Sequence, residues 1–93
     1  MADVTVVDNG ARSRYEAWVD GRLAGHINYR RGPGYLDFLH TEVESEFDGH
    51  GVGSRLAAGA LDDVRAHGGR IVATCPFVRE YLERHPGYAD LTT

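Results

Sequence analysis

The sequence predicts an α+β domain in which a mainly antiparallel sheet is crossed on one face by a central helix. Between residues 4 and 43, apolar and β-branched residues recur in short runs separated by turn-forming residues, which is typical of four strands in a meander. From Val52 onward, apolar residues recur every three or four positions, which is the period of an amphipathic helix. A short apolar run at residues 70–74 then follows. We therefore expect a crossover that places this last strand parallel to the fourth.

Length and composition indicate one ordinary domain over residues 1–93. The chain is 42% hydrophobic and 26% charged, and it is long enough for a single core. It has neither an apolar run of the roughly 20 residues that cross a bilayer nor a secretory signal, so we expect a cytoplasmic protein that does not bind membranes. The net charge of −4 argues against a nucleic-acid partner. One cysteine, Cys75, excludes an internal disulfide and fits a reducing compartment.

The first three predicted strands are separated by strong turn signals. Residues 4–7 are β-branched and end at Asp8-Asn9-Gly10, and Asp20-Gly21 forms the two-residue hairpin signature after the alternating residues 14–19. Residues 22–30 are predicted to form the returning strand of this hairpin, and a second turn follows at residues 31–34. The face predicted to be buried by the second strand contains Tyr15, Ala17 and Val19.

The fourth strand, residues 35–44, alternates in the same way. Strict alternation places Leu36, Phe38, His40 and Glu42 on one face. The spacing therefore predicts that His40 and Glu42 are neighbours on a face that is otherwise apolar.

Two helices complete the predicted fold. The first has about four turns and packs on the sheet through Val52, Leu56, Ala57, Ala60, Leu61 and Val64, and His67-Gly68-Gly69 ends it. Pro76 suits the first position of a short C-terminal helix, which Pro86-Gly87 stops. The apolar stripe of this second helix contains Phe77, Val78, Tyr81 and Leu82.

Three glycines, Gly49, Gly51 and Gly53, lie where the fourth strand passes into the central helix. The first backbone N–H groups of a helix lack partners, and the helix dipole adds partial positive charge there. Glycines leave these groups open to a bulky anion, and Ser54 adds a hydroxyl, so we predict a phosphate site. The alternative is a turn that only lets the helix pack tightly on the sheet. Neither a P-loop, which needs Lys before Ser54, nor a dinucleotide fingerprint matches the spacing.

The segment "DGHGVGSRLAAGAL" resembles the acyl-CoA-binding motif of the Gcn5-related N-acetyltransferases, Arg/Gln-x-x-Gly-x-Gly/Ala at the start of the central helix. Together, "HTEVESEFDGHGVG" and "CPFVREYLERHPGYADL" are similar to a small single-domain subfamily, over roughly residues 15–91. The resemblance implies a minimal acyl-CoA N-acyltransferase fold and binding of acetyl-CoA or coenzyme A through its pyrophosphate. Asp48 departs from the motif's Arg or Gln. The implied binding residues are Val43, Asp48, Gly49, His50, Gly51, Val52, Gly53, Ser54 and Arg84.

Four residues are candidates for catalysis. Cys75, at the start of the last helix, has a position that lowers thiol pKa values. The resemblance places it beside the acyl thioester, where it would carry the acetyl group or contact the coenzyme sulfur, and the alternative is a buried small hydrophobe. His40 or Glu42 suits the base that deprotonates an amine, although either also fits a structural role. The resemblance further suggests Tyr81 as the acid for the leaving thiolate, with core packing as the alternative. Arg84 contacts the coenzyme or complements the helix dipole.

The sequence leaves two functions open. The first is an acetyl-CoA-dependent N-acetyltransferase acting on a primary amine, and the second is an inactive coenzyme A-binding sensor or interaction module. Full-length relatives insert helices where residues 8–14 leave room only for a turn, so an open acceptor site is expected. That site suits a protein or peptide amine, or a pocket completed by a second subunit, so the protein is expected to be a monomer or a homodimer. The five scattered histidines predict no metal site.

Overall fold

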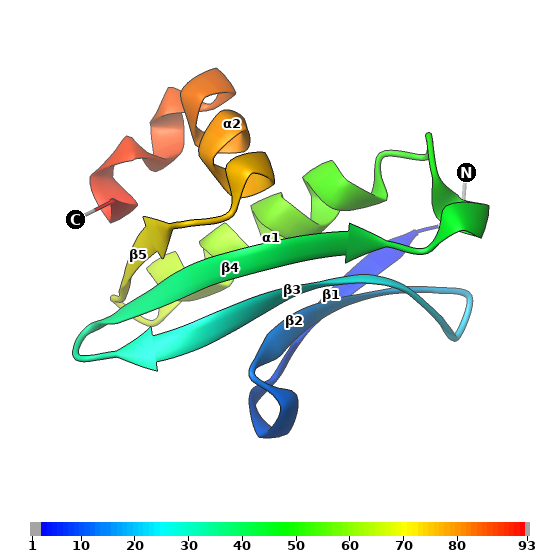
Figure 1. The fold of residues 1–93 in the computed structure, drawn as a ribbon, viewed down its shortest axis with the longest axis horizontal. Coiled ribbons are helices and arrows are strands. Elements are labelled where there is room, and N and C mark those ends of the chain that lie inside the picture. The colour runs from blue at the N-terminus through cyan, green and yellow to red at the C-terminus, as the bar shows by residue number, and fades with distance from the viewer. Residues whose placement is uncertain (1–2, 93) are drawn as a thin grey trace.

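The computed structural model describes residues 3–92 and has the predicted α+β architecture (Figure 1). Met1, Ala2 and Thr93, which the predicted domain includes, lie outside the described residues. Short 3₁₀ turns occupy Gly10–Arg12, Ser45–Phe47 and Pro86–Leu91. The strands and helices are β1 (Val4–Asn9), β2 (Arg14–Val19), β3 (Arg22–Gly32), β4 (Tyr35–Val43), α1 (Val52–Ala66), β5 (Arg70–Ala73) and α2 (Pro76–Arg84).

The five strands form one sheet in the order β1-β2-β3-β4-β5. The first four are antiparallel, and β5 is parallel to β4, which confirms the predicted meander and crossover. The hairpin turn Asp20-Gly21 is also confirmed, with φ angles of 50° and 77°. Positive φ at both turn residues matches the right-handed twist of the flanking strands, so this turn sets the pairing of β2 with β3.

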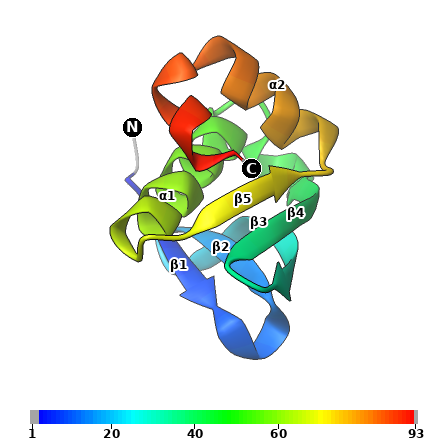
Figure 2. The same cartoon turned by 90° about the vertical axis from the view of Figure 1, so that its left-hand side faces the viewer.

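Both helices lie on the same side of the sheet, above it in Figure 1, and Figure 2 shows the same arrangement from the end. We call the face toward the helices the inner face and the opposite face the outer face. All six predicted apolar residues of α1 are buried, and with the inner-face residues of the sheet they form one core. Large members of this core are Tyr15, Ile27, Phe38, Leu56, Leu61 and Ile71.

A β-bulge in β4 overturns one prediction. Asn28 pairs with His40 while the next residue, Tyr29, pairs with Phe38, so Leu39 is an extra residue without a partner on β3. Such an insertion shifts the alternation by one residue. His40 and Glu42 are therefore neighbours on one face, as predicted, but this is the outer face, and the prediction that they share a face with Leu36 and Phe38 is wrong.

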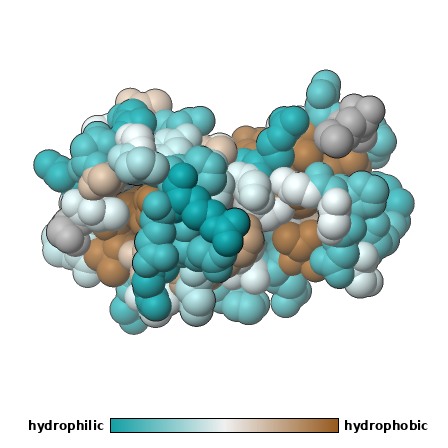
Figure 3. Space-filling view, turned by 90° about the horizontal axis from the view of Figure 1, so that it is seen from above, coloured by the Kyte–Doolittle hydropathy of each residue, from teal (hydrophilic) through white to brown (hydrophobic). Residues whose placement is uncertain are grey.

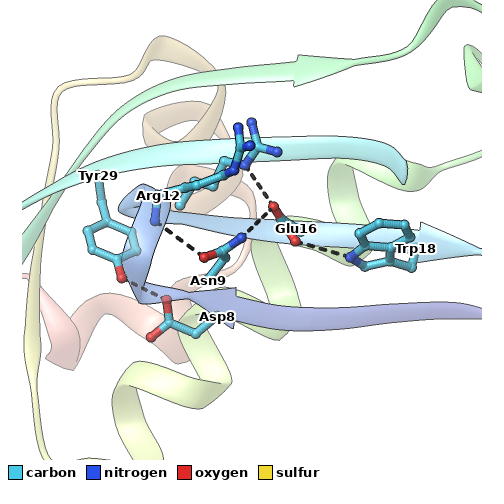
Figure 4. A network of polar contacts seen from close by, with 7 residues as sticks. Asp8, Asn9, Arg12, Glu16, Trp18 and Tyr29 are labelled. Carbon is cyan, nitrogen blue, oxygen red and sulfur yellow. Dashed lines mark hydrogen bonds and ion pairs between the residues drawn. The ribbon is translucent and has the colours of Figure 1, made fainter. Parts of the chain in front are cut away.

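The outer face contains a buried carboxylate, Glu16, that holds its neighbours in place (Figure 4). Its oxygens accept hydrogen bonds from Asn9 Nδ2 at 3.0 Å, Arg14 Nε at 2.8 Å and Trp18 Nε1 at 3.2 Å. Burial alone would raise the pKa of Glu16, but these hydrogen bonds and the Arg14 charge outweigh it, so the pKa is lowered. Figure 4 also shows Asp8, which accepts a hydrogen bond from Tyr29 at 2.7 Å.

We predict that Gly59→Ala destabilises the protein although alanine favours helix. A Cβ at Gly59 in α1 would lie 2.7–2.9 Å from three atoms of Val6 in β1, closer than carbon atoms pack, so the helix must move off the sheet. Overpacking of this kind costs about 1–3 kcal/mol, more than the propensity gain of about 1 kcal/mol. Chemical denaturation would measure the change. Arg55→Ala at an exposed position of α1 is the control, and a stabilised Gly59→Ala variant would contradict the close packing.

We predict that Glu16→Gln lowers the free energy of unfolding by an amount that depends on pH. A carboxyl group whose folded pKa is lowered stabilises the fold above its unfolded pKa of about 4.3, and this contribution is lost as the pH falls through the folded value. The difference in unfolding free energy between wild type and variant should therefore be largest near neutral pH and shrink below about pH 4. Glu83→Gln, at an exposed position of α2, is the control. Parallel pH curves for Glu16→Gln and wild type would rule out this role.

Candidate functional site

The connection from β4 to α1 leaves the start of the helix open. Gly49 and Gly51 have left-handed φ angles of 79° and 74°, and Gly51 is the N-cap without a side-chain cap. Both are exposed, and nothing lies within 4 Å of a Cβ built on either one. The backbone conformation rather than crowding explains why glycine is suited to these two positions.

The first amides of α1 are available to a ligand. The first intrahelical bond joins Arg55 N–H to the carbonyl of Gly51 at 3.1 Å, so the amides of residues 52–54 precede the hydrogen-bonded ladder. The Ser54 side chain is exposed, whereas the Val52 side chain is buried in the core and leaves only its backbone for a ligand. This geometry fits the predicted anion site. The packing alternative applies to Gly53, where a Cβ would lie 2.8 Å from the ring of Phe77.

The other predicted binding residues contribute side chains of different kinds. Asp48, at the end of the Ser45–Phe47 turn, and His50 are exposed. Arg84 lies in the last turn of α2 and pairs with Glu80 at 2.8 Å, an i,i+4 contact that suits the dipole interpretation. Val43 is half-buried at the end of β4. Among the predicted binding groups, the backbone amides are therefore the best suited to an anion, and the exposed side chain of Arg55 follows them in α1.

A split opens between β4 and β5 beside this loop. The two strands pair only from Tyr35↔Arg70 to Phe38↔Ala73, and Cys75 N–H then donates to the Phe38 carbonyl at 2.8 Å. Beyond that bond the chain enters α2, and within the described part of the chain residues 39–43 of β4 have no strand partner on this side. Leu39 and Phe77 are unusually exposed for large hydrophobic residues, at 37% and 40%. Figure 3 shows hydrophobic side chains reaching the surface between hydrophilic ones on the helix side.

Cys75 is buried on the inner side of the split. It is 2% exposed, is the N-cap of α2 as predicted, and its Sγ lies 3.3 Å from Thr41 Oγ1. Thr41 is not among the predicted site residues, because the bulge at Leu39 turns it to the inner face, where it pairs with the buried Ile27. A shift in strand alternation of this kind has no signal in the sequence.

His40 and Glu42 are together on the outer side. His40 Nε2 lies 3.7 Å from Glu42 Oε1, and both side chains are more than half exposed. The structure therefore brings His40 to Glu42 and Cys75 to Thr41, but it places these two pairs on opposite faces of β4.

Tyr81 faces the C-terminal turn. Its ring stacks on His85 with centroids 3.9 Å apart and lies 6.2 Å from the ring of Tyr88. Burial, together with the charge of Asp62, raises the pKa of its hydroxyl. These contacts favour the packing interpretation, and a role for Tyr81 as an acid stays a prediction.

Cavities also lie outside the split. One of about 410 Å³ adjoins the glycine loop and is lined by Phe47, His50 and Val52. Another, of about 530 Å³, lies at the other end of α1 near Tyr15 and Asp63. Among residues 3–92, no group of three or more His, Cys, Asp or Glu residues is arranged to hold a metal ion. Within the same range, no helix has the length and apolar character needed to span a bilayer.

A family model described as GCN5-related N-acetyl-transferase matches residues 14–91. The solution structure of a GCN5-like protein of Staphylococcus aureus, described as a candidate N-acetyltransferase, is similar with a TM-score of 0.72 at 23% identity, covering 100% of this chain and 91% of that one.

A ribosomal-protein-alanine N-acetyltransferase of Brucella melitensis is similar with a TM-score of 0.61 at 20% identity, covering 86% of this chain and 60% of that longer chain. No curated protein sequence matches. At these identities the structural likenesses support the fold, and the family model supports membership. The chain belongs to the GCN5-related N-acetyltransferase family.

Proposed function

We propose that this protein is an acetyl-CoA-dependent N-acetyltransferase that transfers the acetyl group directly to a primary amine. One observation carries the proposal. The uncapped N-terminus of α1, with the open amides of residues 52–54, lies beside a split in the sheet. A helix N-terminus stabilises a diphosphate, and an open strand edge pairs with an extended ligand.

Acetyl-CoA fits the residues that are present, and its thioester supplies the acetyl group. The amides of residues 52–54 would hold its diphosphate, because Gly49 and Gly51 leave the start of the helix open. The free edge of β4, residues 39–43, would hydrogen-bond the extended part of the coenzyme. Leu39 and Phe77 would cover its apolar segments.

His40 is the proposed general base. An amine must lose its ammonium proton before it can attack a thioester, and imidazole accepts a proton near neutral pH. Glu42 lies toward Nε2, which favours a proton on that nitrogen and leaves Nδ1 free to accept one from the amine. Since both side chains are exposed on the outer face, the amine would approach from that side.

Cys75 is proposed to support the site rather than to carry the acetyl group. A nucleophilic thiol must reach the thioester, but Cys75 is 2% exposed and contacts Thr41 on the inner side. Direct transfer needs no covalent step at Cys75. The second function is an inactive coenzyme A-binding module. It differs from the enzyme in that it would bind the coenzyme without transferring an acetyl group.

We predict that Ser54→Asp separates helix stability from coenzyme binding. A carboxylate in the first turn of α1 stabilises the helix by about 0.3–1 kcal/mol through the helix dipole. The same charge repels a diphosphate, so the Kd for coenzyme A should rise at least tenfold, which corresponds to about 1.4 kcal/mol. Calorimetric titration and thermal unfolding measure the two effects. Ser54→Ala is the control and should keep the affinity within about threefold. Unchanged binding by Ser54→Asp would remove the diphosphate from this loop.

We predict that His40→Gln lowers kcat by about 10²-fold or more, whereas Cys75→Ala keeps most of the activity. Steady-state rates with an amine acceptor would test this, and mass spectrometry after incubation with acetyl-CoA should find no acetyl group on Cys75. An acetylated Cys75, together with an inactive Cys75→Ala variant, would replace direct transfer by a covalent route. Coenzyme binding with no turnover on any acceptor would favour the inactive module.

A further inference from the structure

The outer face of the sheet has an unusual feature, which is a buried charge that no helix covers. Neither α1 nor α2 lies on this face, yet the Glu16 side chain is 7% exposed. Burying a carboxylate is unfavourable unless it is paired and hydrogen-bonded, and an apolar residue at such a position is often equally stable. A role in stability alone does not explain why a carboxylate is placed here.

The network around Glu16 fixes the orientation of Trp18. The indole N–H donates to one Glu16 oxygen, while Asn9 and Arg14 bind the other, so the carboxylate cannot turn away from the ring (Figure 4). Trp18, the only tryptophan, is half-buried on this uncovered face beside Leu23, its partner on β3. An aromatic ring held in one orientation binds a partner with little further loss of entropy.

Carboxylates lie across the sheet from this ring. The register places Glu16, His26 and Glu42 in one row, with His40 in the next row. Glu44, just past the end of β4, is exposed and forms no ion pair among residues 3–92. Two arginines also lie on this face, but Arg14 pairs with Glu16 and Arg30 pairs with Asp37. Aromatic faces and carboxylates both attract cations, so Trp18, Glu42 and Glu44 are the groups on this surface that suit a positively charged partner.

We propose that the outer face docks the acceptor as an extended cationic peptide, with Trp18 stacking on one of its side chains and Glu42 and Glu44 attracting its positive charges, so that its lysine reaches His40. The assignment of the docked peptide as the acceptor rests on the function proposed above. Glu16 acts here as a positioning residue for Trp18.

The spacing favours a peptide over a small amine. Trp18 and His40 are separated by two strand spacings and four residues along the strands, or roughly 16 Å. An extended peptide spans that distance with about five residues.

The experiment measures binding without acetyl-CoA. The indole N–H signal of Trp18, which is the single tryptophan, is followed by NMR during titration with two blocked nonapeptides that have one central lysine, flanked by arginines in one and by glutamates in the other. We expect the arginine peptide to shift this signal and the glutamate peptide to leave it unchanged. Raising the salt should weaken the binding.

Variants locate the contact. Glu44→Gln should raise the Kd of the arginine peptide at least threefold. Glu83→Gln, which removes one charge from an exposed position of α2, should leave this Kd unchanged. Glu16→Gln should shift the free indole signal and also weaken binding, although its fold, checked by the remaining amide signals, is retained.

Three results would overturn the docking surface: an indole signal that no peptide moves, equal effects of Glu44→Gln and Glu83→Gln, or spermidine shifting the signal as strongly as the arginine peptide. The readout also separates the two proposals. A peptide that shifts the Trp18 indole signal but is never acetylated would support the docking surface and contradict the proposed acetyltransferase activity. A peptide that is acetylated without shifting this signal would support the activity and contradict the docking surface.

Discussion

The rest of the structure depends on one constraint, which is the unequal length of the neighbouring parallel strands β4 and β5. β4 has nine residues and β5 has four, so the strands pair briefly and then separate. β5 is short because Pro76, which has no N–H to donate, starts a helix directly after Cys75. The remainder of β4 keeps a free edge and leads to the glycine loop. The open edge and the open helix N-terminus therefore have one cause, and the site lies where they meet.

Much of the fold could be predicted from the sequence because it follows from local patterns. The hairpin at Asp20-Gly21, the stripe of α1 and the start of α2 at Pro76 depend on residues close together in the chain. The bulge at Leu39 could not be predicted, since leucine is an ordinary strand residue and nothing nearby marks an insertion. One extra residue moved His40 and Glu42 to the other face. The glycine loop could be predicted from its three closely spaced glycines. The contacts Thr41–Cys75 and Glu16–Trp18 depend on backbone register and side-chain orientation, which cannot be read from the sequence.

The bulge also divides the site between the two faces of the sheet. The inner face packs against the helices, so a side chain that points there, such as Cys75, is enclosed and suited to support. The outer face meets solvent, so His40 is accessible there, as its proposed role as a base requires. Without the bulge, His40 would point into the core beside Phe38, where burial disfavours the charged imidazole that a base must form. A base at this position therefore depends on the insertion at Leu39.

The charges of the chain fit two ligands of opposite sign. An acidic protein with a net charge of −4 is a poor partner for a diphosphate if side chains must bind it. Backbone amides are dipoles that carry no net charge, so they can bind the anion while Asp48 and Glu46 remain close by in sequence, Glu46 being paired with Arg22. In the proposed function, the carboxylates would then be free to attract the other ligand, a cationic amine. If backbone amides bind the anion and side chains attract the cation, substitutions on the outer face should change the acceptor without disturbing the coenzyme.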